Sequence, residues 1–277
     1  MSILRCVASA IVAAMDTRAA APLRPPTDSP CALVTGGGIR VGAAIVRALA
    51  DAGYRVWIHY NRSEAPAARL ADSLAGAALG TIGADLTDDA ARRRLIDTVV
   101  DPKGPAAGRL DLLVNSAASF ESGAFLARSD DDLLRVLTIN LLAPLSLIRG
   151  LAPALAATEG SAVNILDLAA TQPWRGYADH CVSKAALAMA TRALAGELAP
   201  MIRVNGVAPG TVLWPDDERF GPGSEGRERV LQGIPLGRAG EPEDVARAVL
   251  YLARERFITG HSIVVDGGRA VGRGACP

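Results

Sequence analysis

The chain has 277 residues, half of them hydrophobic, and its 29 basic and 29 acidic side chains give a formal net charge of zero. This length allows one large domain or two small ones. The balanced charge, without a long basic run, argues against non-specific nucleic-acid binding. No uninterrupted apolar run reaches the roughly 18 residues typical of a membrane span. The four cysteines lie far apart and predict neither a disulfide framework nor a zinc site, so reduced thiols in a cytoplasmic protein are expected.

Residues 1–29 are expected to form a flexible N-terminal extension. They contain a short apolar stretch followed by three alanines at 19–21, which weakly resembles a signal peptide. Asp16 and Arg18 interrupt this pattern before the alanines, which favours a flexible extension over an export signal. Three prolines between positions 23 and 30 predict an irregular lead-in, because proline lacks a backbone N–H donor.

From residue 30 onward, apolar strand-like runs alternate with helix-like stretches. This order is typical of an α/β fold, here a single Rossmann-type, doubly wound parallel sheet of about seven strands with helices on both faces. Strands are expected, in chain order, at 32–34, 55–60, 80–84, 110–115, 162–166, 202–207 and 262–265. Helices are expected at 41–52, 65–75, 90–100, 130–157 and 181–199. No repeat or linker divides this part, so residues 30–277 are expected to form one domain.

A glycine-rich segment at 35–42 directly follows the first strand and opens the first helix. Glycine lets the backbone turn sharply and approach a pyrophosphate, whose charge is favoured by a helix N-terminus. The strand before the segment and the helix after it separate this pattern from a plain tight turn. The segment therefore predicts a dinucleotide site that includes Gly36, Arg40 and Val41.

The residues after the second strand predict which nicotinamide cofactor the protein binds, NADH or NADPH. The run His59, Tyr60, Asn61, Arg62, Ser63 contains no acid that would bind a ribose 2′-hydroxyl and repel a 2′-phosphate. Arg62 and Ser63 instead offer a positive charge and a hydroxyl donor. NADPH is therefore the expected cofactor, with His59 and Tyr60 as further contacts.

Lys184 stands four residues after His180, which places both side chains on one helix face, one turn apart. This pair resembles the Tyr-x-x-x-Lys pair of the short-chain dehydrogenases/reductases, with histidine in the tyrosine position. The resemblance covers residues 31 to about 268. It implies that Lys184 contacts the nicotinamide ribose and that Asn140 holds a water in a proton relay.

The same resemblance implies cofactor contacts at the ends of later strands. Asp85 and Leu86 would touch the adenine, and Thr211 would approach the nicotinamide carboxamide. Ser116 departs from the family's usual Asn-Asn-Ala-Gly, but a small residue suffices for close approach. The full set implied at these strand ends is Asp85, Leu86, Asn115, Ser116, Ala117, Pro209, Gly210 and Thr211.

Asp167 lies thirteen residues before His180, where the family usually has serine, and this narrows the resemblance to pteridine reductases. Arg40 is similar to their arginine that reaches the pterin and the pyrophosphate. Phe120 is similar to the phenylalanine that stacks the pterin against the nicotinamide, and Tyr177 would line the substrate pocket.

The segment 211–233 is polar and rich in glycine and proline, and it predicts a mobile lid over the substrate. Trp174 and Trp214 are expected to add to a flat pocket that suits a planar heterocycle. Arg273 resembles a C-terminal arginine that reaches a neighbouring subunit's site in the pteridine reductases. The resemblance thus implies a homotetramer.

Hydride transfer to a C=O or C=N bond leaves negative charge that a proton must quench. Lys184 as a cation favours neutral imidazole at His180, whereas Asp167 as a carboxylate favours imidazolium, the better proton donor. Three interpretations stay open. His180 and Asp167 form the acid together; Asp167 or Tyr177 delivers the proton through water while His180 shapes the pocket; or the protein is inactive or repurposed.

We therefore expect an NADPH-dependent reductase of pteridine-reductase type that reduces a C=N bond of a pterin or dihydrofolate-like heterocycle. A carbonyl or imine reductase of secondary metabolism is the first alternative. A protein that binds NADPH without turning it over is the second. No metal, nucleic acid or membrane partner is expected.

Overall fold

The computed structural model describes residues 29–214 and 218–272. The expected N-terminal extension, apart from its last residue, and Arg273 lie outside this part. The described chain forms one seven-stranded sheet in the order β3-β2-β1-β4-β5-β6-β7, with every neighbouring pair parallel. The expected doubly wound, Rossmann-type α/β fold is thus confirmed.

The strands lie close to their expected positions because parallel strands covered on both faces have continuous apolar runs. Every residue of the central strands β1, β4 and β5 is buried. The strands are β1 (Cys31–Thr35), β2 (Arg55–Tyr60), β3 (Ala78–Gly83), β4 (Leu112–Asn115), β5 (Ser161–Ile165), β6 (Arg203–Pro209) and β7 (Ser262–Val265).

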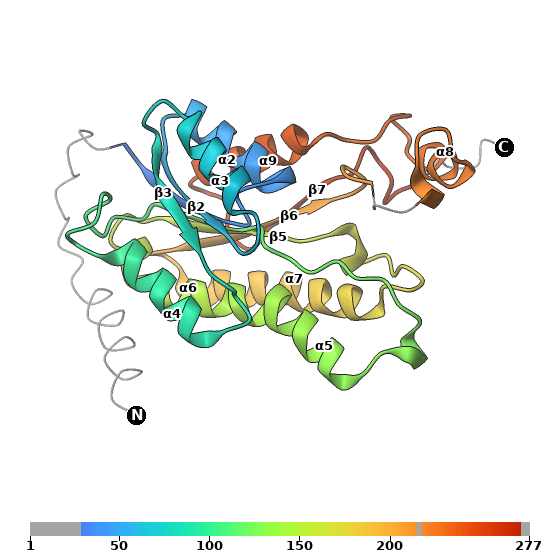
Figure 1. The fold of residues 1–277 in the computed structure, drawn as a ribbon, viewed down its shortest axis with the longest axis horizontal. Coiled ribbons are helices and arrows are strands. Elements are labelled where there is room, and N and C mark those ends of the chain that lie inside the picture. The colour runs from blue at the N-terminus through green and yellow to red at the C-terminus, as the bar shows by residue number, and fades with distance from the viewer. Residues whose placement is uncertain (1–28, 215–217, 273–277) are drawn as a thin grey trace.

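Helices cover both faces of the sheet, as Figure 1 shows. One face carries α2 (Arg40–Asp51), α3 (Glu64–Asp72) and α9 (Pro242–Arg254), and the other carries α4 (Asp89–Val100), α5 (Asp130–Leu137), α6 (Ala143–Ala156) and α7 (Ala178–Leu198). A separate hydrophobic core fills each side. The first core contains Ile45, Leu49, Val249 and Leu252, and the second contains Leu95, Leu147, Leu151 and Leu155.

Two helices were not expected from the sequence. Helix α9 packs against α2 and begins with a capping box between Glu241 and Asp244, with Pro242 in its first turn. Helix α8 (Glu225–Gln232) lies within the segment expected to be a mobile lid, and the Ser224 hydroxyl caps it by accepting the Arg227 N–H at 3.3 Å. The segment thus contains a short helix, and its role as a lid stays a prediction.

The single helix expected at 130–157 is divided by a π-helical turn, η2 (Thr138–Leu142), between α5 and α6. Its apolar composition gives an 18-residue window with mean hydropathy 1.5, enough to cross a membrane by length and composition alone. In the fold this stretch covers the sheet, with Leu147 and Leu151 in the core. The wide turn holds Asn140 beside the loop that follows β4, which matters for the site.

Candidate active site

A buried histidine holds the glycine-rich loop in place. His59 is only 1% exposed at the end of β2; its Nδ1 accepts the Gly36 N–H at 3.0 Å, and its Nε2 donates to the Ala84 carbonyl at 2.9 Å. Burial lowers the pKa of His59, which favours the neutral ring that both contacts require. Both ring nitrogens of His59 bind the backbone, so these atoms hold the loop, and a direct contact of His59 with the cofactor stays a prediction.

The glycines of this loop are required by close contacts. Gly36 has φ +63°, and a Cβ on it would lie 3.0 Å from the Ala117 Cα. A Cβ on Gly42, in the first turn of α2, would lie 2.1 Å from the Gly36 carbonyl oxygen. No side chain caps the N-terminus of α2 and its first turn has no acid, so its free N–H groups suit a pyrophosphate.

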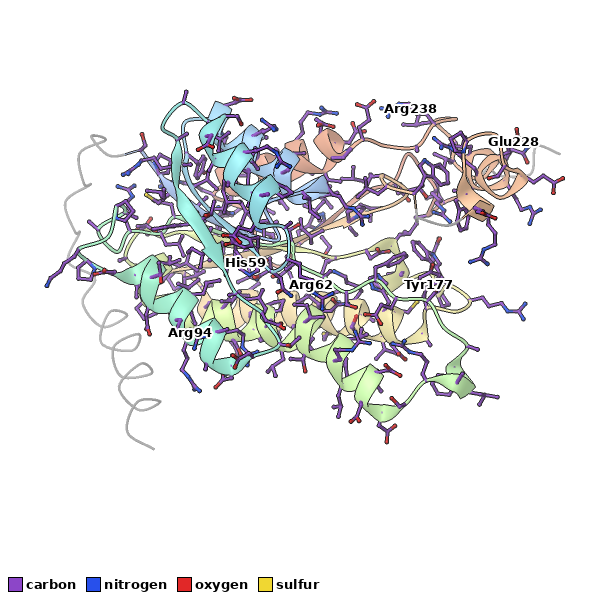
Figure 2. All side chains as sticks on the ribbon, in the orientation of Figure 1. His59, Arg62, Arg94, Tyr177, Glu228 and Arg238 are labelled. Carbon is purple, nitrogen blue, oxygen red and sulfur yellow. The ribbon has the colours of Figure 1, made fainter. Side chains whose placement is uncertain are left out.

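Polar side chains surround this loop where a 2′-phosphorylated ribose would lie. Arg40 and Arg62 are exposed, and the Ser63 hydroxyl lies close to Gly38, 3.2 Å from where a Cβ on that glycine would stand. Figure 2 shows Arg62 next to His59 in the middle of the molecule. These residues offer positive charge and a hydroxyl donor beside the loop, groups that a phosphate can bind.

The other residues near the loop divide into exposed and buried ones. Val41 and Tyr60 are half-buried at its two sides. Asp85 is exposed, and hydrogen bonds from Thr87 lower the pKa of its carboxyl. Leu86 is buried in the core, so any contact of this residue with an adenine would come from its backbone.

The end of β4 is fixed by buried polar side chains. Asn115 donates through Nδ2 to Asn164 Oδ1 at 2.9 Å, so it braces β4 against β5. The Thr35 hydroxyl accepts the N–H groups of Ser116, at 2.9 Å, and Ala117, at 3.1 Å. Asn115 is thus a buried brace, while the Ser116 and Ala117 backbones are held against Gly36.

The four expected catalytic side chains come together at the end of β5. His180 donates through Nδ1 to the Ser119 carbonyl at 3.1 Å, and its Nε2 lies 3.3 Å from Asp167 Oδ2. Asn140 fixes the same Ser119, accepting its N–H at 2.8 Å and donating to its carbonyl at 3.0 Å. The π-helical turn thus positions the acceptor that orients the imidazole.

The hydrogen-bond partners of His180 determine where protons lie. A carbonyl oxygen can only accept, so Nδ1 carries a hydrogen. Without another hydrogen between Nε2 and Asp167, a nitrogen lone pair would face carboxylate lone pairs. A hydrogen shared between Nε2 and Oδ2 would satisfy both groups. Asp167, with a side chain 20% exposed, faces the site, whereas the His180 side chain is 3% exposed behind it.

Lys184 is buried, and its Nζ donates to the Ile165 carbonyl at 2.7 Å. Burial lowers the pKa of Lys184 to about 8, while the nearby Asp167 opposes this shift. An ammonium has three donors. Lys184 can therefore keep this bond and still donate to a ribose hydroxyl.

A cluster of three aromatic rings lies beside the imidazole, and Phe120 contacts it. Phe120 is 43% exposed and stacks on Tyr177 with ring centroids 4.6 Å apart, while His180 meets it edge-on at 4.8 Å. Trp174 packs edge-on against Phe120 and Tyr177, at 6.1 Å from each. Trp214 does not join them, because it stacks on Phe220 within the lid segment at 6.3 Å. Figure 2 shows Tyr177 at the end of the molecule that carries α8.

Arg269 is a site residue that the sequence analysis missed. It donates to the Thr211 hydroxyl, and its guanidinium lies 5.3 Å from the centre of the Trp174 ring. Pro209 ends β6, and Gly210 follows it beside the turn after β7, where a Cβ on Gly210 would meet Asp266 at 2.6 Å. Its position in the sequence could have identified it, because Arg269 follows the Asp-Gly-Gly turn at the carboxyl end of β7. Ligands of such sheets bind at the carboxyl ends of the strands.

Residues 38–270 match the family model described as enoyl-(acyl carrier protein) reductase. A relative named ketoacyl reductase 2 of the granaticin polyketide synthase, from Streptomyces violaceoruber, is 37% identical over 87% of this chain and 96% of its own. The protein belongs to the short-chain dehydrogenase/reductase family. Pteridine reductase 1 of Leishmania tarentolae is 35% identical over 88% of this chain and 98% of its own.

Two solved structures share the fold over most of the chain. FolM alternative dihydrofolate reductase 1 from Brucella canis, complexed with NADP, is 34% identical with a TM-score of 0.76 over 89% of this chain and 96% of that one. A blue fluorescent protein from a metagenomic library, in complex with NADPH, is 32% identical with a TM-score of 0.77 over 89% of this chain and 100% of that one. The protein is thus an oxidoreductase with a nicotinamide cofactor.

Proposed function

We propose that this protein is an NADPH-dependent reductase that transfers hydride to a C=N bond of a pterin or dihydrofolate-like heterocycle. The observation that carries the proposal is the Asp167–His180 pair next to the exposed Phe120 ring, which contacts the imidazole at a right angle. A planar ring stacked on Phe120 would have its nitrogen next to a group that holds a proton. The likeness to pteridine reductase 1 and to FolM dihydrofolate reductase supports this substrate class.

The preference for NADPH is supported by the groups around the glycine loop. Arg62 and Ser63 offer a charge and a hydroxyl for a 2′-phosphate, and the run 59–63 contains no acid. The nearest carboxylate after β2, Glu64, is hydrogen-bonded to the Tyr60 side chain. The free N–H groups of α2 and the Gly36 turn would hold the pyrophosphate. NADPH, when bound, supplies the hydride.

Asp167 is the group that we assign to deliver the proton. It is more exposed than His180, and its Oδ1 is held by the Ala169 N–H at 2.7 Å, which fixes its orientation toward the site. His180 stands behind it, oriented by Ser119, and shares its proton with Oδ2. Of the three open interpretations, this geometry favours the first, with Asp167 touching the substrate and His180 as its proton source.

A ketone or imine reductase of secondary metabolism is the second candidate. The same pair would protonate the alkoxide left after hydride transfer to a carbonyl, and the named ketoacyl reductase is a relative at 37% identity. An NADPH-binding protein without turnover is the third candidate, because imidazole replaces the family's tyrosine.

We also propose that the protein is a cytoplasmic homotetramer. Among the described residues, Cys181 is a buried free thiol, which is consistent with a reducing compartment. Exposed apolar side chains lie on α5, η2 and α7, which pack against one another and offer an apolar face to a second subunit. They are Leu134, Leu142, Val182 and Met189.

NADPH consumption tests the proposed function. Purified protein is supplied with 7,8-dihydropterin, dihydrofolate and a panel of ketones and cyclic imines, with NADPH and separately with NADH. We expect turnover of a dihydropterin with NADPH, and a higher KM for NADPH in Arg62→Ala. Turnover of ketones alone would select the second candidate, and tight NADPH binding without any turnover would select the third.

A further inference from the structure

We propose that Arg269 recognises a carboxylate or similar anionic group on the substrate, and so selects anionic planar heterocycles over neutral ones. This rests on the proposed function, since it assumes a ring stacked beside Phe120. Arg269 lies at the junction of the two halves of the site. Its Nη1 reaches Thr211, expected next to the nicotinamide, and its guanidinium covers Trp174 of the aromatic cluster.

The turn after β7 presents Arg269 rigidly. Asp266 accepts the N–H groups of Gly268 at 2.8 Å and Ala270 at 2.5 Å, which closes the turn around Arg269. The Gln172 side chain donates to the Ala270 carbonyl at 2.8 Å and ties this turn to the loop after β5. A charged group held in this way loses little conformational freedom when it binds a ligand.

The charge of Arg269 is left without an ion pair among the residues that the structure describes. Asp167 and Asp266 are the carboxylates that influence it, and burial lowers the pKa of Arg269 against their attraction. Asp167 already binds His180 and the Ala169 N–H, and Asp266 binds its own turn. A half-buried guanidinium without a bonded carboxylate is costly unless a ligand supplies one.

The N–H donors of Arg269 that do not bind Thr211 indicate which class of ligand it would recognise. Guanidinium has five N–H donors in a planar fork that matches a carboxylate with two parallel bonds. The Thr211 hydroxyl takes a single donor, and the Trp174 face holds the plane in one orientation. A neutral methyl or hydroxymethyl substituent at the same position on the substrate would leave the Arg269 guanidinium without an ion pair.

Equilibrium binding tests the proposal without requiring turnover. Pterin-6-carboxylate and 6-methylpterin share one ring and differ only in the charge of the substituent. Their dissociation constants are measured by pterin fluorescence on the full-length protein saturated with NADP⁺. We expect the carboxylate to bind about tenfold or more tightly than the methyl compound. In Arg269→Met this ratio should fall toward one, and in Arg269→Lys it should fall only in part.

Arg94→Met is the matched control, because Arg94 is exposed on α4, far from Tyr177 in Figure 2. It should keep the preference. Equal binding of both ligands to the native protein, or a preference that persists in Arg269→Met, would overturn the assignment, as would an equally large loss of NADPH affinity in that variant. A retained preference without dihydropterin turnover would defeat the proposed function alone, and binding of neither ligand would defeat both.

Discussion

Residues at this site have two kinds of role: some take part in proton transfer, and others hold neighbouring groups in position. His180 illustrates both, because its Nδ1 is fixed by the Ser119 carbonyl while its Nε2 lies 3.3 Å from Asp167, with which we propose that it shares a proton. His59 only holds, with both nitrogens bound to backbone atoms. The sequence could name both histidines but not separate their roles, because a role depends on which atoms lie within hydrogen-bond distance.

Substitution of His59 should weaken cofactor binding. His59→Phe removes the acceptor of the Gly36 N–H and the donor to Ala84, so the loop loses two hydrogen bonds of about 1 kcal/mol each. We expect the Kd for NADPH, measured by its fluorescence, to rise about tenfold or more. His261→Phe, at an exposed position, is the control. Unchanged NADPH affinity in His59→Phe would contradict the holding role.

Lys184 should make stability depend on pH in a defined window. Its pKa is lowered to about 8 by burial from the usual 10.5, so between these values the unfolded chain binds more protons than the folded one. Stability therefore rises with pH across this window. Relative to Lys184→Met, the free energy of unfolding in urea should increase by about 2 kcal/mol from pH 7.5 to 9.5. A difference independent of pH would show that Lys184 titrates normally.

At the scale of elements, the strands could be predicted and the helices only in part. Buried parallel strands have an unmistakable apolar run, whereas α8 has a polar sequence and no buried residue. The π-helical turn around Asn140 arises from packing between α5, α6 and α7, which no local pattern encodes. Arg269 was missed for a related reason: its contacts with Thr211 and Trp174 join three distant parts of the chain.

The contact between α2 and the glycine loop is open to a matched test with two glycines. A methyl group on Gly42 would lie 2.1 Å from the Gly36 carbonyl oxygen, whereas one on Gly196, in α7, meets nothing within 4 Å. Gly42→Ala should lower both the Tm and the NADPH affinity. Gly196→Ala should instead raise stability by up to about 1 kcal/mol, because alanine favours the helix. Equal effects of the two substitutions on thermal unfolding would refute the close-contact argument.

At the scale of the whole molecule, a parallel sheet explains why residues far apart in sequence share one site. The carboxyl ends of its strands meet at one edge, so Gly36, Asn115, Asp167 and Thr211 could be assigned to a common site from chain order alone. The oligomeric state is harder to predict from sequence, because an exposed apolar residue does not show which surface it packs against. Trp214 stacks on Phe220 within the lid segment, apart from the Phe120, Trp174 and Tyr177 rings, and its expected contact with a substrate stays a prediction.

The proposed tetramer predicts a change of mass on substitution of the exposed apolar face. Leu134→Glu with Met189→Glu places charges on α5 and α7, where both native side chains are exposed in the single chain. Light scattering should give a tetramer for the native protein and a smaller species for the variant. An identical mass for both would exclude this face as the interface.

The claim that Asp167 and His180 act as one proton donor is tested most directly by a double-mutant cycle on kcat for NADPH-dependent dihydropterin reduction. Asp167→Asn and His180→Phe should each lower kcat by about 100-fold or more, and the double variant should be about as slow as the slower single variant, because either change disables the same pair. If the two losses instead multiply, or if His180→Phe retains near-native kcat, the two residues act independently and the shared-proton account is wrong.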